Sequence, residues 1–157
     1  MAKKRRGKIA FISVFFITVS VLVIAALQYK PSPPSLDIIK VTINNVTFKL
    51  YEPKTVREHE IGLAAYDTLG EDQGMIFRGL PEGTQSIWMK DMKFDIDVLW
   101  VNKDNQIIHI VQGMSRSSYP QTFHNPVNMP SSYVVELPAE ATITHSITIG
   151  QTVEIHD

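Results

Sequence analysis

The chain has 157 residues, 44% of them hydrophobic, which is enough for one compact domain with attachments. Six of the fifteen Lys and Arg residues lie at positions 3 to 30, whereas all sixteen acidic residues lie at or beyond Asp37. The remainder holds nine basic and sixteen acidic residues, a net charge of −7, which argues against a nucleic-acid partner. The sequence has no cysteine, which excludes disulfides, thiolate nucleophiles and zinc–thiolate sites.

The N-terminal segment has the pattern of a membrane anchor. Residues 1–8 carry five positive charges, and residues 9–27 follow with nineteen uncharged, mostly apolar residues. A helix of that length is about 28 Å long, close to the roughly 30 Å hydrocarbon thickness of a bilayer. We therefore expect a single-pass signal-anchor helix over 9–29, with residues 1–8 in the cytoplasm and the C-terminal part outside the membrane. The alternative is a cleaved signal peptide, which would make the protein secreted.

A Pro- and Ser-rich linker over 30–36 leads into a domain over 37–157 that begins with a hairpin. Asn44 and Asn45 tolerate the positive φ of a tight hairpin turn. With that turn, all apolar side chains of residues 38–51 share one face. The predicted pairs are Ile43 with Val46, Val41 with Phe48 and Ile39 with Leu50.

The next elements are a helix and two buried segments. A capping box formed by Thr55 and Glu58 predicts one helix over 56–66, on which His59 is expected to face solvent. The "GMIF" stretch over 74–77 predicts a short buried strand. Residues 96–102 and 106–112 predict a central hairpin, apolar on both faces. Its expected pairs are Trp100 with His109, Val98 with Val111, Leu99 with Ile110 and Val101 with Ile108.

The C-terminal third is less periodic. Residues 113–130 are expected to form a long loop, which in a compact domain is often functional. Residues 132–137 predict a strand, the alternation over 143–149 predicts a half-exposed strand, and residues 150–152 turn into a last strand over 153–155. The sum is a mainly β domain, an antiparallel sandwich or partly closed barrel with one short helix, preceded by the transmembrane helix.

Two groups of side chains could carry chemistry. Asp95 and Asp97 share a strand face roughly 7 Å apart, where they could divide acid and base roles in hydrolysis. The favoured alternative is that they pair with Lys90 and Lys93 in solvent. The methionines and histidines would suit copper(I), but Met commonly fills gaps in cores. We expect no metal, and no glycine-rich phosphate loop or dinucleotide fingerprint is present in the sequence, so no cofactor is expected.

Several motifs together carry a family resemblance. They are "GMIF" at 74–77, "WMKDMKFDID" at 88–97, "YVVEL" at 133–137 and a terminal "IGQTVEI". In this order they resemble the domain-of-unknown-function family 192 over residues 38–155. The resemblance implies a mainly β, sandwich-like domain, often behind a signal or anchor, and no established activity. The matching positions are Trp88, Met89, Lys90, Asp97 and Glu136. Asp91 stands where asparagine is usual, Asp95 where proline is usual, and residues 63–66 replace the common Leu-Met-x-Arg.

The expected function is a membrane-anchored, extracytoplasmic binding or accessory domain for a small molecule, sugar, peptide or other cell-envelope component. Lys90 would meet an anionic or carbonyl group, and carboxylates would meet hydroxyls or amines. A carboxylate-based hydrolase or lyase and a purely structural assembly partner are the alternatives, so the domain is expected to bind rather than to catalyse. The candidate site consists of Trp88, Lys90, Asp91, Asp97 and Glu136.

Overall fold

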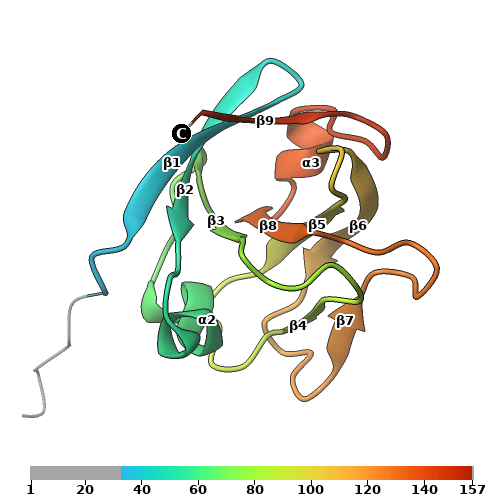
Figure 1. Ribbon diagram of the computed structural model, residues 1–157. Helices are drawn as coiled ribbons and strands as arrows, with labels where there is room; N and C mark the ends of the chain where they lie inside the picture. The colour runs from blue at the N-terminus through green and yellow to red at the C-terminus, as the bar shows by residue number, and fades with distance from the viewer. Residues whose placement is uncertain (1–32, 157) are drawn as a thin grey trace, which may run out of the picture. The chain divides into compact units, whose positions relative to one another are not determined.

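A computed structural model of the protein describes residues 33–156 (Figure 1). The expected transmembrane helix over 9–29 lies outside the described residues, as do the basic flank and the start of the linker. No helix within 33–156 is both long and apolar enough to cross a membrane. Residues from 33 onward form a compact unit of their own.

The domain is built on one seven-stranded sheet with the order β6-β5-β8-β3-β2-β1-β9. All neighbouring pairs are antiparallel except β2 and β3, which run parallel. The strands of this sheet are β1 (Asp37–Ile43), β2 (Val46–Glu52), β3 (Gln73–Phe77), β5 (Ile96–Val101), β6 (Ile107–Met114), β8 (Tyr133–Pro138) and β9 (Val153–His156). A separate ribbon pairs β4 (Ser86–Trp88) with β7 (Thr122–His124).

The sheet curls until its two edge strands approach each other at one end. Gln106, just before β6, forms a bridge with Thr152, just before β9. The Ile107 amide donates to the Gln151 carbonyl at 2.9 Å, and the Gly150 amide donates to the Ile107 carbonyl at 2.8 Å. The prediction of a mainly β domain is confirmed. Of the two predicted architectures, the partly closed barrel describes the curled sheet. The sandwich does not, because residues 33–156 do not form two packed sheets.

The two predicted hairpins form. Asn44 and Asn45 adopt φ values of 48° and 65°, and the three expected β1–β2 pairs are all present. Three of the four expected β5–β6 pairs are present, but the prediction for Val101 is wrong, because Val101 pairs with Ile107 instead of Ile108. A register irregularity between Trp100 and Val101 causes this shift. Such a bulge adds one residue to one strand, and side-chain alternation does not reveal it.

The predicted strand over 143–149 is wrong. Its first residues belong to a one-turn helix, α3 (Ala141–Thr144), and Ile143 is 65% exposed. A residue from another element holds this helical turn in place. The Asp97 carboxylate, on β5, accepts hydrogen bonds from the backbone amide and the side-chain hydroxyl of Thr142. The predicted long loop is also interrupted by β7, and the predicted helix over 56–66 divides into α2 (Val56–Ile61) and a 3-10 turn, η1 (Gly62–Ala65).

Both faces of the sheet are covered by apolar side chains. One cluster includes Phe48, Leu99 and Val135, and the other includes Met75, Val98 and Trp100. Gly74 allows β3 to pack closely in this arrangement, because a Cβ there would lie 2.3 Å from the Glu136 carbonyl oxygen and 2.6 Å from Leu50. In Figure 1, α2 and the β4–β7 ribbon lie at the end of the domain away from β9.

Candidate functional site

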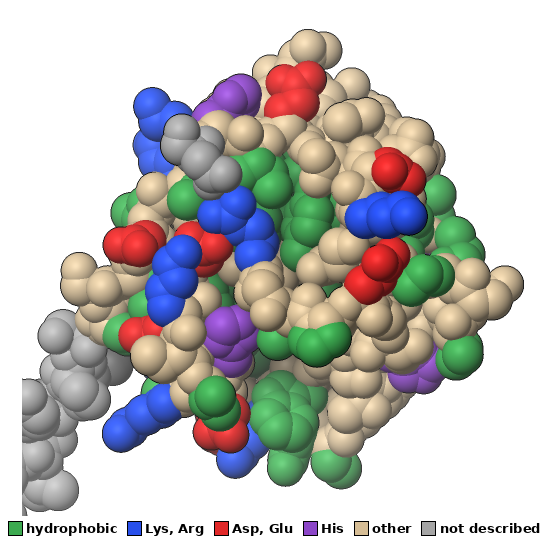
Figure 2. Space-filling view, in the orientation of Figure 1, with side chains coloured by type: hydrophobic (Ala, Val, Ile, Leu, Met, Phe, Trp, Pro, Cys, Tyr) green, Lys and Arg blue, Asp and Glu red, His purple; other side chains and the backbone are tan. Residues whose placement is uncertain are grey.

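A cavity of about 1000 Å³ lies between α2 and β4, with part of β3 and β8 as its floor. Figure 2 shows hydrophobic side chains gathered around a hollow in the region that α2 and β4 occupy in Figure 1. Four apolar side chains that line the cavity are also exposed to solvent: Val56 (77%), Ile61 (38%), Leu80 (38%) and Trp88 (47%). The cavity therefore opens through an apolar rim.

The helical wall is fixed by local signals. The Thr55 side chain accepts from the Glu58 amide at 3.2 Å, and the Glu58 carboxylate accepts from the Thr55 amide at 2.9 Å, so the predicted capping box is confirmed. Gly62 ends α2 with a φ of 52°, a conformation that favours glycine. The wall is thus short, and the chain turns immediately afterwards to bury Leu63.

The opposite wall is tied to the sheet by buried polar contacts. The Trp100 indole donates to the Gln85 carbonyl at 2.8 Å. The fully buried Asn125 accepts from the Gln85 amide at 2.8 Å and donates to the Met129 carbonyl at 2.6 Å. These bonds hold the start of β4 over the sheet and keep the cavity open between the ribbon and α2.

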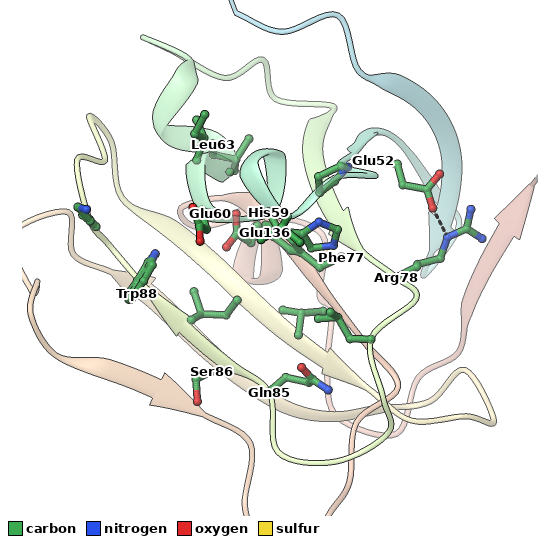
Figure 3. A pocket seen from close by; sticks show the side chains of 18 of the residues that line it. Glu52, His59, Glu60, Leu63, Phe77, Arg78, Gln85, Ser86, Trp88 and Glu136 are labelled. Carbon is green, nitrogen blue, oxygen red and sulfur yellow. Dashed lines mark hydrogen bonds and ion pairs between the residues drawn. The ribbon is translucent and has the colours of Figure 1, made fainter.

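Glu136 lies on the floor of the cavity and is only 5% exposed (Figure 3). Its cross-strand neighbours are Met75 on β3 and Val98 on β5, and Val134 precedes it on the same face of β8. Within residues 33–156 no hydrogen bond or ion pair reaches its carboxyl group. Burial raises the pKa of Glu136 to about 8, so the carboxyl group is mainly protonated at neutral pH.

His59 brings a second unpaired polar atom to the same cavity. Its Nδ1 lies 2.9 Å from the Thr55 carbonyl oxygen, one turn earlier in α2, and its ring contacts Phe77 with centroids 5.7 Å apart. Its Nε2 is buried and has no hydrogen-bond partner among the described residues. The expectation that His59 faces solvent holds only in part, because the residue is half-buried and its ring contacts Phe77 on β3.

Two of the cations that line the cavity contact a different carboxylate, that of Glu52. Arg78 donates through Nε to Glu52 at 2.7 Å, and Lys54 pairs with the other oxygen of Glu52 (Figure 3 draws the Arg78 contact). Burial raises the pKa of Glu52, but the hydrogen bonds and charges of Arg78 and Lys54 outweigh it and hold the pKa below its ordinary value. Glu52 is therefore an ionised, neutralised part of the wall, unlike Glu136.

Three of the five sequence-predicted site residues meet at this cavity, namely Trp88, Lys90 and Glu136. Asp91 is exposed in the turn after β4, with a φ of 58°, and does not line the cavity. Asp97 is fully buried away from it. The sequence reading missed Glu52, His59 and Arg78, although Glu52 and Arg78 stand at or just beyond the ends of apolar strands, where polar side chains often reach a site.

Asp97 has a structural environment. Its Oδ1 accepts from the Gly113 amide at 2.8 Å and the Glu140 amide at 3.3 Å. Its Oδ2 accepts from the Thr142 amide at 2.9 Å and the Thr142 hydroxyl at 2.6 Å. Both oxygens are satisfied, so this carboxylate joins β5 to β6 and to the start of α3. The neighbouring Asp95 accepts from the Arg116 amide at 2.9 Å.

Two solved structures share this fold. One is a protein of Sinorhizobium meliloti 1021, provisionally assigned as a transcription regulator, with 21% identity and a TM-score of 0.70 over 78% of this chain and 96% of that one. The other is a protein of unknown function from Novosphingobium aromaticivorans DSM 12444, with 23% identity and a TM-score of 0.70 over 83% of this chain and 96% of that one. Both chains therefore consist almost entirely of the domain described here.

Comparison with curated proteins gives no match. The family model described as Uncharacterized ACR, DUF192, matches residues 39–155, which span all nine strands of the domain apart from the first two residues of β1 and the last of β9. This protein belongs to the DUF192 family.

Proposed function

We propose that the domain is a binding module that takes a small ligand with a hydrocarbon body into the cavity between α2 and β4. The cavity volume of about 1000 Å³ lies at the upper end of the range for small-molecule sites. Most of its surface is apolar, and the charged and polar side chains among its lining residues could orient a ligand. The observation that carries the proposal is the buried, unpaired carboxyl group of Glu136 on the cavity floor.

An unpaired buried carboxyl group is unfavourable for folding. Most buried polar groups in proteins have a hydrogen-bond partner, and leaving one without a partner costs about 1–3 kcal/mol or more. The carboxyl oxygens of Glu136 are not among the fully buried atoms that lack a partner, so they face the cavity, where a ligand group could reach them. Ionisable groups with such perturbed environments concentrate at functional sites, where a ligand supplies the missing partner.

The two alternatives receive less support. A two-carboxylate hydrolase needs both carboxyl groups to face one substrate. Asp95 and Asp97 instead accept hydrogen bonds from backbone amides. A purely structural role predicts that the charged side chains close on one another in an ion-pair cluster. Glu52 forms such a cluster with Arg78 and Lys54, but Glu136 is not part of it. A nucleic-acid partner is disfavoured by the net charge of −7 beyond position 30.

The cavity is tested with N-phenyl-1-naphthylamine, a neutral dye that fluoresces in apolar sites. Residues 33–157 are used alone, since they form a compact unit. We expect the dye to bind, and Ile61→Trp to weaken binding by roughly tenfold, about 1.4 kcal/mol, because Ile61 lines the cavity mouth. Ile143→Trp is the matched control, an exposed helical isoleucine outside the cavity. Equal effects of the two substitutions, or no dye binding, would contradict the proposal.

We also propose that the domain is held outside the cytoplasm by residues 9–29. The support is the basic flank followed by nineteen uncharged residues in the sequence. A phosphatase reporter that folds only outside the cytoplasm, fused after Asp157, is expected to be active. A reporter that works only in the cytoplasm is expected to be silent at the same position, and its activity would show that the orientation is wrong. Retention of the fusion in the membrane fraction distinguishes an anchor from a cleaved signal peptide.

A further inference from the structure

We infer that the cavity selects a protonated amine with a hydrocarbon body, whose ammonium group pairs with the Glu136 carboxylate. This inference rests on the proposed function and names the ligand class of the same cavity. The hydrocarbon body would lie along the apolar lining, which includes Leu63, Phe77 and Val134. The ammonium group would supply the partner that Glu136 lacks.

With Glu136 ionised, the unpaired polar atoms that residues 33–156 bring to the inner cavity are hydrogen-bond acceptors. A carbonyl oxygen can only accept, so the contact with Thr55 places the proton of a neutral His59 ring on Nδ1. The buried Nε2 is then an acceptor without a donor. An ionised Glu136 adds two acceptor oxygens. A complementary ligand must therefore bring hydrogen-bond donors, and a positive charge matches the carboxylate best.

Residues 33–156 bring no cation into an ion pair with this carboxylate. Arg78 and Lys54, which also line the cavity, both contact Glu52. Lys90 is exposed, and no ion pair joins it to Glu136 in the described part of the chain. Because the two lysines are exposed, water screens their charges, whereas an ion pair on the floor is screened much less. A ligand carboxylate would instead place a second negative charge beside an ionised Glu136, so it could bind only while Glu136 stays protonated.

Binding of an amine should release a proton. Since the carboxyl group is mainly neutral below about pH 8, an ammonium ligand must shift it to the ionised form. The affinity should therefore rise by about tenfold per pH unit up to about pH 8 and then level off. Other charged or titratable side chains that line the cavity are Glu52, Lys54, His59, Glu60, Arg78 and Lys90. Substitution of Glu136 separates its contribution from theirs.

The test uses three ligands with the same eight-carbon chain and different head groups: octylammonium, octanol and octanoate. Each displaces N-phenyl-1-naphthylamine from residues 33–157, below its micelle concentration, at about pH 6.5 and about pH 8.5. Two proteins are compared, the unaltered domain and Glu136→Gln, which keeps the side-chain size and removes the charge. Nonspecific adsorption of octylammonium to the acidic protein surface would also occur with Glu136→Gln. The difference between the two proteins therefore reports only the contribution of the Glu136 charge.

At about pH 8.5 we expect octylammonium to bind the unaltered domain at least about tenfold more tightly than octanol, since hydrogen bonds to charged groups contribute that much. The preference should shrink at the lower pH and be lost in Glu136→Gln at both. The inference would be overturned if octylammonium bound no more tightly than octanol, or if octanoate bound most tightly of the three. Either result would leave the proposal of a ligand-binding cavity standing. Failure of the dye itself to bind would instead overturn the proposed function.

Discussion

Glu136→Gln is expected to stabilise the domain at pH 7 by on the order of 3 kcal/mol. Burial raises the pKa of the Glu136 carboxyl group from its ordinary value of 4.5 to about 8 in the folded state. Between these values the folded state binds more protons than the unfolded state. The free energy of unfolding therefore falls as pH rises from about 5 to about 8, and the loss is complete above the folded pKa.

Urea denaturation at about pH 5, 7 and 8.5 checks this expectation. The unaltered domain should lose stability across the series, and Glu136→Gln should lack that part of the decline. Glu60→Gln is the matched control, because Glu60 lines the same cavity but is exposed. Parallel pH profiles for the unaltered domain and Glu136→Gln would show that the carboxyl group is hydrated or paired in the folded state.

Asp97→Ala is expected to destabilise the domain by roughly 3 kcal/mol, because it leaves three backbone amides, among them that of the buried Thr142, and the Thr142 hydroxyl without an acceptor. Thr142→Val removes only one of these bonds to Asp97 and should cost about 1–2 kcal/mol. Asp104→Ala, in an exposed turn, should change stability little. Denaturant midpoints of the three variants give the comparison.

The same variant separates the structural carboxylate from the cavity. Asp97 does not line the cavity, so the folded fraction of Asp97→Ala should bind N-phenyl-1-naphthylamine with unchanged affinity. A well-folded Asp97→Ala domain that no longer binds the dye would place Asp97 in the site after all. That outcome would restore the sequence-based expectation for this residue.

The sequence predicted the fold where local signals set the geometry. Asn44 and Asn45 fix the first hairpin, and Thr55 with Glu58 fixes the start of α2. The prediction from sequence failed where a residue distant in the chain determines the local backbone conformation. Residues 143–149 alternate like a strand, but the Asp97 carboxylate holds the preceding turn as a helix from 45 positions away. The bulge near Val101 likewise leaves no mark in the alternation.

The candidate site was predicted only in part for a related reason. Trp88, Lys90 and Glu136 were identified through motifs, and the curled sheet brings them to one cavity. Glu52 and Arg78 come from β2 and the end of β3, which meet through a parallel pairing that no turn signal indicates. The apolar run around Glu136 indicates burial, but which face of β8 points at the cavity depends on how α2 and β4 cover the sheet.

Glu136 lies buried on the cavity floor, and no hydrogen bond or ion pair from residues 33–156 reaches its carboxyl group, which a ligand is proposed to pair with. Carbon NMR of the Glu136 side-chain carboxyl group, followed against pH in residues 33–157, tests it most directly. We expect a midpoint of about 8 in the free domain and a lower midpoint when octylammonium is present. A midpoint near 4.5 in the free domain would contradict the account, because the carboxyl group would then already be solvated or paired.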